Sequence, residues 1–158
     1  MPSIKATDEK VADQKMLIML ADDDSDDRSL FTDAFQKVKT IATSLQIFED
    51  GVELLENLEK VEELPHIIFL DLNMPKKSGI ECLREIRQNH RFDSVSIAIY
   101  STSNRARDVE ETFSLGANVY IHKPSNFDEL KRVLKYVLKM NWQFHLAGMN
   151  KETFFLNV

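Results

Sequence analysis

Short apolar runs that recur at regular intervals limit the folds open to this sequence. Five runs predict strands, namely Met16–Leu20, Leu45–Phe48, His66–Leu70, Val95–Tyr100 and Val119–Ile121. The second run is a weaker, alternating pattern, whereas the others are nearly continuous in apolar residues. Continuous apolar strands are typical of a sheet that helices cover on both faces.

Helical patterns fill the intervals between these runs. The first helix begins near Ser25, and its apolar face consists of Leu30, Phe31, Ala34, Phe35 and Val38. Three other segments begin with a capping residue followed three positions later by Glu, at Asp50-x-x-Glu53, Ser78-x-x-Glu81 and Asn126-x-x-Glu129. A further segment, Ala106–Leu115, ends at Gly116, a residue suited to the position after a helix. Strand and helix therefore alternate along the chain, which predicts an α/β fold with a parallel sheet.

The length of the chain fits one domain with short appendages. The chain has 158 residues, of which 43% are hydrophobic, so it can bury a substantial core. We expect residues 1–15 to be a flexible N-terminal tail and residues 16–140 to form the domain. Residues 141–158 are then a C-terminal extension that is too short for an output domain. The extension ends in Phe154-Phe155-Leu156, which we expect to pack on the domain's own surface, with a dimer or partner surface as the alternative.

Charge and cysteine content argue against several classes of function. The formal net charge of −6 disfavours nonspecific binding to nucleic acid, which needs a basic surface. Cys82 is the only cysteine, so an internal disulfide is excluded. The N-terminal residues lack the apolar region of a signal peptide, and no apolar run approaches the ~18 residues of a membrane span. We therefore expect a cytoplasmic protein that binds neither nucleic acid nor membrane.

Polar residues follow four of the predicted strands. They are Asp22 and Asp23 after the first strand, Asp71 after the third, Ser101 and Thr102 after the fourth, and Lys123-Pro124 after the fifth. The carboxyl ends of parallel strands meet at one edge of the sheet, where ligands of open α/β sheets bind. Carboxylates, hydroxyls and an ammonium group at one edge suit a divalent cation and a phosphoryl group. Taken singly, each residue could instead cap a helix, form a turn or be solvated, and we attribute capping to Asp24, Asp26 and Asp27.

The same segments resemble the receiver domains of two-component response regulators, over roughly residues 16–140. The matching motifs are Met16-Leu17-Ile18-Met19-Leu20-Ala21-Asp22-Asp23, Asp71-Leu72-Asn73-Met74-Pro75 with Ser78-Gly79, Tyr100-Ser101-Thr102-Ser103, and Tyr120-Ile121-His122-Lys123-Pro124. They occur in the order and at the spacing of that family. The resemblance implies a flavodoxin-like, doubly wound (βα)5 fold, with a five-stranded parallel sheet in the order 2-1-3-4-5.

The resemblance also implies a reaction. Asp71 would be the phosphoacceptor, which takes a phosphoryl group from a phosphohistidine on a sensor histidine kinase or a histidine phosphotransfer protein. The implied cofactor is Mg²⁺, and its protein ligands would be Asp22, Asp23, Asp71 and the backbone carbonyl of Asn73. Lys123 would pair with a phosphoryl oxygen, and Pro124 would follow a cis peptide bond.

A switch is implied as well. The Ser101 hydroxyl would hydrogen-bond to the phosphoryl group, and Tyr120 would turn inward on activation. These changes would alter the surface formed by helix 4, strand 5 and helix 5, for partner binding or phosphorelay. Thr102 stands where small residues are usual in the family, so we expect Thr102 and Met74 to tune the access of water to phosphorylated Asp71.

Two other functions share parts of this pattern. A receiver-like scaffold without phosphorylation would keep the fold and lose the switch, although Asp71, Ser101 and Lys123 are intact. A magnesium-dependent phosphatase with an aspartyl-phosphate intermediate usually needs a second Asp two residues after the nucleophile, where this chain has Asn73. We therefore predict a single-domain response regulator, a signalling switch and not an enzyme beyond self-phosphorylation and slow autodephosphorylation. The sequence does not identify its kinase or its downstream protein, and it does not determine whether the protein forms a homodimer.

Overall fold

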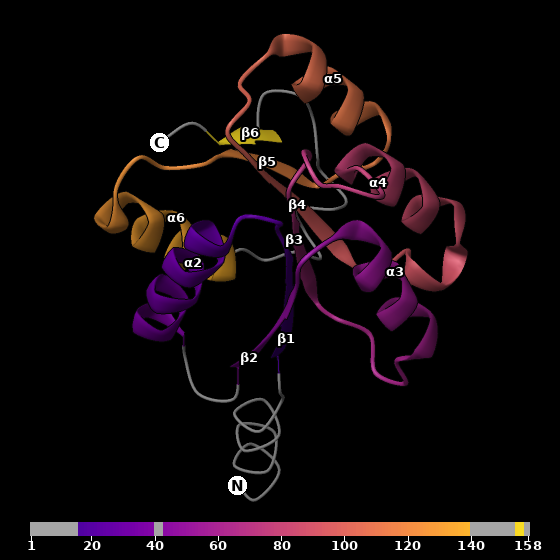
Figure 1. Ribbon diagram of the computed structural model, residues 1–158, viewed down its shortest axis with the longest axis horizontal. Helices are drawn as coiled ribbons and strands as arrows, with labels where there is room; N and C mark the ends of the chain where they lie inside the picture. Colours follow the sequence, from indigo (N-terminus) through magenta and orange to yellow (C-terminus); the bar gives the residue numbers. More distant parts are fainter. Residues whose placement is uncertain (1–15, 40–42, 140–153, 157–158) are drawn as a thin grey trace, which may run out of the picture.

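The fold consists of one parallel sheet between two layers of helices (Figure 1). The computed structural model describes residues 16–39, 43–139 and 154–156. In chain order the elements are β1 (Met16–Ala21), α2 (Ser25–Val38), β2 (Thr43–Phe48), α3 (Gly51–Lys60), β3 (Ile67–Leu70), α4 (Gly79–Gln88), a 3₁₀ turn (His90–Phe92), β4 (Ser96–Ser101), α5 (Ala106–Ser114), β5 (Val119–His122), α6 (Phe127–Lys139) and β6 (Phe155–Leu156).

The strands pair in parallel in the order β2-β1-β3-β4-β5-β6. This confirms the predicted α/β fold and the predicted order of its first five strands. The register sets Ala21 of β1 beside Leu70 of β3, and Ser101 of β4 beside His122 of β5. Because the strands run in one direction, the residues that follow these positions share one edge of the sheet.

Helices cover both faces of the sheet (Figure 1). On one face α2 and α6 pack over a core that includes Ile18 and Leu20, and on the other α3, α4 and α5 pack over one that includes Met19 and Ala21. Successive residues of β1 thus face opposite layers, and each layer contains a cluster of buried apolar residues, as the continuous apolar runs predict. Among the residues described, no helix is long and apolar enough to cross a membrane.

Side-chain caps confirm where the predicted helices begin. At each of four helix starts a side-chain oxygen accepts from the backbone N–H three residues later. Asp24 Oδ1 accepts from Asp27 at 2.9 Å and Asp50 Oδ1 from Glu53 at 2.8 Å. Ser78 Oγ accepts from Glu81 at 3.2 Å and Asn126 Oδ1 from Glu129 at 2.9 Å. These bonds satisfy N–H groups that the first helical turn leaves without backbone partners. After α5, Gly116 has φ of 98°, a left-handed conformation that glycine adopts without strain.

A sixth strand extends the predicted sheet. Phe155 and Leu156 of β6 pair in parallel with Tyr120 and Ile121 of β5, and Phe154 beside them is fully buried. So short a segment carries no periodicity and was not predicted as a strand, although the sequence favoured packing of this segment on the domain over a partner surface. The structure places it on the domain's own sheet. The expectations for residues 1–15 and for residues 141–153 fall outside the described part of the chain.

Arg87 of α4 links this helix by hydrogen bonds to the segments that precede β4 and β5. Its guanidinium donates to the carbonyl oxygens of Gly116, Phe92 and Val95 at 2.8, 3.0 and 2.8 Å, and to Asn118 Oδ1 at 2.9 Å. Asn118 Oδ1 also accepts from the backbone N–H of Ile97 in β4, at 2.7 Å. One planar side chain thus donates to three backbone carbonyls, of which that of Phe92 also accepts from the N–H of Val95.

We expect Arg87→Lys to lower the free energy of unfolding by about 2 kcal/mol, because one ammonium group cannot reach all of these acceptors. The measurement is chemical denaturation of the purified variant. Arg84→Lys is the matched control on the same helix, since Arg84 is half exposed and its ion pair with Glu111 spans 3.9 Å. The control should change stability by less than about 0.5 kcal/mol. Equal losses in the two variants would contradict a stabilising role of the Arg87 network.

Candidate functional site

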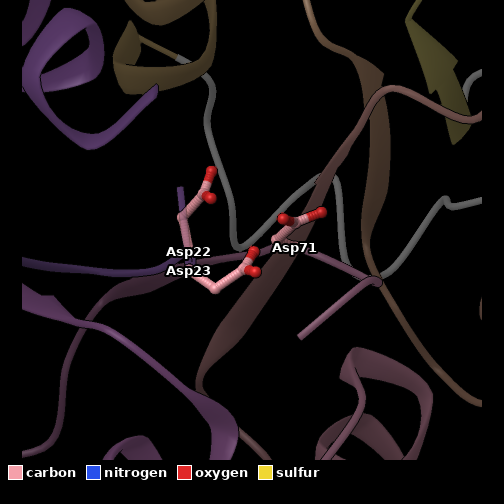
Figure 2. A group of neighbouring side chains, drawn as sticks. All are labelled: Asp22, Asp23 and Asp71. Carbon is pink, nitrogen blue, oxygen red and sulfur yellow. The ribbon is translucent and has the colours of Figure 1, made fainter. Parts of the chain in front are cut away.

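Three carboxylates converge at the carboxyl edge of the sheet (Figure 2). Asp22 directly follows β1 and Asp71 directly follows β3, and the N–H of Asp71 donates to the carbonyl of Ala21 at 3.0 Å. Oxygen atoms of Asp22, Asp23 and Asp71, here called the acidic cluster, all lie within 4.8 Å of one another. Asp22 is fully buried and Asp71 nearly so, whereas Asp23 is exposed. The structure therefore brings together carboxylates that lie about fifty positions apart in the sequence.

Lys123 reaches the acidic cluster from the end of β5. Its backbone N–H donates to the carbonyl of Ser101 at 2.8 Å, which continues the pairing of β5 with β4. Its Nζ lies 2.9 Å from Asp22 Oδ2, 2.8 Å from Asp27 Oδ2 and 3.5 Å from Asp71 Oδ2. The Lys123 side chain is only 9% exposed, so its charge is compensated by these carboxylates more than by water.

Asp27 is a member of this site that the sequence analysis missed. We attributed a capping role to it, and this was wrong, because its carboxylate pairs with Lys123 while Asp24 caps the helix. Asp26 and Asp27 both lie in the first turn of α2, and nothing in the sequence distinguishes them. The helical geometry alone decides which of the two carboxylates faces back toward the strand ends.

The pKa values follow from burial and from the opposed charges. Burial raises the pKa of Asp71 to about 6, an effect that the positive charge of Lys123 opposes and the negative charge of Asp22 reinforces. Burial also works against the charge of Lys123, but its hydrogen bond to Asp27 and the negative charge of Asp71 raise its pKa above the ordinary value. At neutral pH the carboxylate of Asp71 is therefore mostly ionised and lies beside the protonated ammonium group of Lys123.

The donor set fits a hard divalent cation. Asp22 Oδ2 is buried and accepts no hydrogen bond from the described residues, although Lys123 Nζ lies beside it as an ion-pair partner. Hard cations such as Mg²⁺ favour carboxylate oxygens and relieve the repulsion between neighbouring carboxylates. Asp22, Asp23 and Asp71 are the residues that could hold such an ion, with exposed Asp23 on its solvent side.

The other predicted site residues differ in how deeply they are buried. Ser101 is the last residue of β4 and is fully buried, and its Oγ accepts a hydrogen bond from the N–H of Ser103 at 3.1 Å. Thr102 and Asn73 are exposed. Met74 is nearly buried in the core beneath α3, α4 and α5. Of these side chains, only that of Ser101 is a buried hydroxyl at a strand end that borders Lys123.

Tyr120 points into the protein from β5. It is fully buried, and its hydroxyl donates to the carbonyl of Ser103 at 2.8 Å. The predicted switch aromatic is therefore in an inward orientation, and its hydroxyl bonds to the loop that follows Ser101.

The loop after Asp71 needs a glycine. A Cβ atom at Gly79 would lie 2.2 Å from the carbonyl oxygen of Asp71 and 2.7 Å from Leu72 Cα, and both are backbone atoms that cannot rotate away. The N–H of Gly79 also donates to the carbonyl of Leu72 at 2.9 Å. The start of α4 thus packs directly on the backbone that carries Asp71, which fixes the position of that carboxylate.

The peptide bond before Pro124 differs from the prediction. No peptide bond in the described segments is cis, so the bond between Lys123 and Pro124 is trans. The prediction of a cis bond was wrong for this structure. A trans bond is the lower-energy form before proline in the absence of other constraints, and Lys123 makes all the contacts described above with it.

The comparison with known families agrees with the geometry of the site. The sequence pattern described as the response regulator receiver domain matches residues 18–135. The chain therefore belongs to the receiver domain family of two-component signalling proteins, which confirms the resemblance seen in the sequence. In this family the acidic cluster is the place of metal binding and phosphorylation, and the residues of this chain fit it.

Individual relatives share most of the chain. Response regulator Rcp1 of Synechocystis sp. is 32% identical over 124 residues, which are 75% of this chain and 84% of Rcp1. The probable methanogenesis regulatory protein FilR2 of Methanothrix harundinacea is 28% identical over 130 residues, which are 80% of this chain and 83% of FilR2.

Solved structures give the same result. The Mn(2+)-bound form of response regulator Rcp1 superposes with a TM-score of 0.70 at 29% identity, over 85% of this chain and 97% of that chain. The phosphorylated cyanobacterial phytochrome response regulator RcpA superposes with a TM-score of 0.74 at 27% identity, over 87% and 98%. The fold of this chain is thus the fold of receiver domains, one of which holds Mn(2+) and another a phosphoryl group.

Asp71 makes the stability of the protein depend on pH in metal-free buffer. Its pKa rises from 3.8 to about 6 on folding, so the folded state binds this proton more tightly than the unfolded state does. The contribution of this proton to stability is present below about pH 4 and is lost as the pH rises through about 6. We expect Asp71→Asn to raise the free energy of unfolding over wild type by about 1–2 kcal/mol at pH 8 and by much less at pH 4, after allowance for solvent screening.

Urea denaturation with EDTA at the two pH values measures this difference. Asp33→Asn is the control, because Asp33 is an exposed carboxylate on α2, and its effect should be small at both pH values. A gain for Asp71→Asn that is equal at pH 4 and pH 8 would show that burial does not oppose the charge of Asp71.

Proposed function

We propose that this receiver domain is a Mg²⁺-dependent switch that accepts a phosphoryl group on Asp71. The donor is a phosphohistidine on a sensor histidine kinase or a histidine phosphotransfer protein in the cytoplasm, and the signal passes to a downstream protein. One observation carries the proposal: the buried carboxylate of Asp71 lies within reach of both a lysine ammonium and two further carboxylates. This is the arrangement that phosphoryl transfer to a carboxylate requires, since the reaction depends on positioning and on compensation of charge.

The transfer itself is a simple exchange of bonds. An oxygen of ionised Asp71 forms a bond to phosphorus, and the bond from phosphorus to the histidine nitrogen breaks. The electron pair of the broken bond returns to the imidazole ring. Because the pKa of Asp71 is about 6, the carboxylate is mostly ionised at neutral pH and ready to act as nucleophile.

Lys123 and the acidic cluster have separate roles in compensating the charge of the phosphoryl group. Lys123 Nζ lies 3.5 Å from Asp71 Oδ2, so a small movement brings its ammonium group to a phosphoryl oxygen at that position. Asp22 and Asp23, with Asp71 and the backbone carbonyl of Asn73, are the proposed ligands of Mg²⁺. When bound, the ion supplies positive charge against the phosphoryl oxygens.

The proposed switch begins at Ser101. Its hydroxyl accepts from the N–H of Ser103, and the same hydroxyl would donate its proton to a phosphoryl oxygen on Asp71. Ser103 in turn accepts from Tyr120, so a change at Ser101 reaches the α5–β5–α6 surface, which is the helix 4–strand 5–helix 5 surface of the sequence prediction. Exposed Thr102 and nearly buried Met74 are proposed to tune the access of water to phosphorylated Asp71.

Treatment with a small-molecule phosphodonor such as acetyl phosphate tests this proposal. We expect intact-mass spectrometry to show the gain of one phosphoryl group in wild type with Mg²⁺, and a reduction of about tenfold or more when the ion is chelated. Asp71→Asn should show no gain, because an amide cannot replace the carboxylate nucleophile.

Asp33→Asn, which changes an exposed carboxylate on α2, is the matched control and should behave as wild type. An adduct that persists in Asp71→Asn would overturn the assignment of the phosphoacceptor. A wild-type protein that accepts no phosphoryl group from any donor would favour the scaffold function, and multiple turnover of a phosphate ester would favour the phosphatase.

A further inference from the structure

The short strand β6 occupies the edge of β5 next to Tyr120. Phe155 pairs with Tyr120 in the sheet, and their rings lie 5.6 Å apart between centroids. Phe154 is fully buried, with its ring 6.2 Å from that of Tyr120 and 5.2 Å from that of Phe113 in α5. The C-terminal segment therefore closes an aromatic cluster around Tyr120, and the docked segment is stabilised by the buried ring of Phe154 and the partly buried ring of Phe155.

The same tyrosine bonds to the loop beside the phosphoacceptor. The Tyr120 hydroxyl donates to the carbonyl of Ser103 at 2.8 Å, and the N–H of Ser103 donates to Ser101 Oγ at 3.1 Å. Ser103 Oγ donates to the buried carboxylate of Asp108 at 2.5 Å, and Arg105 Nε donates to the same oxygen at 3.1 Å. The loop from Ser101 to Arg105 is thus held on one side by α5 and on the other by Tyr120.

We propose that docking of the Phe154–Leu156 strand and occupation of the Asp71 site are positively coupled through Tyr120 and Ser103. This coupling rests on the proposed function, since it concerns the phosphoryl group on Asp71. It assigns to the C-terminal strand a regulatory role: the docked strand keeps Tyr120 inward, and inward Tyr120 holds the loop that presents Ser101.

The sign of the coupling follows from the hydrogen bonds. In the docked structure Ser101 Oγ accepts from the N–H of Ser103 at the end of β4, so this loop conformation holds the hydroxyl that would donate to a phosphoryl group on Asp71. Loss of β6 removes two rings that pack against Tyr120, which weakens the restraint on its inward orientation and on its hydroxyl bond to Ser103. Phosphoryl binding should therefore favour docking, and by linkage docking should favour phosphoryl binding by the same factor.

The N–H groups of Phe155 and Leu156 point to opposite sides of β6, so hydrogen exchange of the one that faces β5 measures docking directly. The phosphoryl site can be filled with beryllium trifluoride and Mg²⁺, a stable stand-in for the phosphoryl group, and its apparent affinity can be followed by fluorine NMR. We expect loading to slow exchange at this amide at least about fivefold, the lower end of common coupling factors. Phe154→Ala, which weakens docking, should weaken beryllofluoride binding by a similar factor.

Tyr120→Phe tests the path while keeping the ring that packs against β6. This variant loses the hydroxyl bond to Ser103, and we expect loading to slow exchange at the same amide less than twofold. Tyr136→Phe is the matched control, since Tyr136 on α6 is 58% exposed, and it should keep the wild-type coupling.

The possible outcomes distinguish failure of the proposed function from failure of the coupling alone. A wild-type protein that does not bind beryllofluoride with Mg²⁺ overturns the proposed function and the coupling with it. Normal binding with unchanged or faster exchange at β6 overturns the coupling alone. Retention of the full effect in Tyr120→Phe would overturn the path through Ser103.

Discussion

The contacts of Lys123 with the carboxylates at the strand ends are the constraint on which the rest of the site depends. Lys123 Nζ lies within 3.5 Å of carboxylate oxygens from Asp22, Asp27 and Asp71, which belong to the ends of β1 and β3 and to the start of α2. A buried ammonium group is costly unless carboxylates compensate it, and a set of buried carboxylates is costly unless cations compensate them. Each partner therefore requires the other, and the sheet edge must hold them in place.

This requirement explains the link between the fold and the proposed chemistry. Lys123 offers one positive charge to several carboxylates, so the site keeps a negative excess that a divalent cation would relieve. A phosphoryl group adds negative charge to Asp71, which strengthens the need for both the cation and the lysine. Strands buried on both faces, and Gly79 packed against the backbone of Asp71, keep these groups from moving apart.

The sequence predicted most of this arrangement because its signals are local. Apolar runs marked the strands, capping residues such as Asp50 and Ser78 marked helix starts, and the residues after each run marked the sheet edge. What escaped prediction depends on contacts between distant segments. Asp27 faces Lys123 from almost a hundred positions away, and β6 is too short to show a period and forms only because β5 offers an unpaired edge.

The phosphoacceptor role of Asp71 is the central claim, and chemical localisation of the phosphoryl group tests it most directly. Reduction of the phosphorylated protein with borohydride converts an aspartyl phosphate to homoserine, which peptide sequencing by mass spectrometry locates. We expect homoserine at position 71 and at no other position. Homoserine at Asp22, Asp23 or Asp27, or phosphorylation that yields no homoserine, would contradict it.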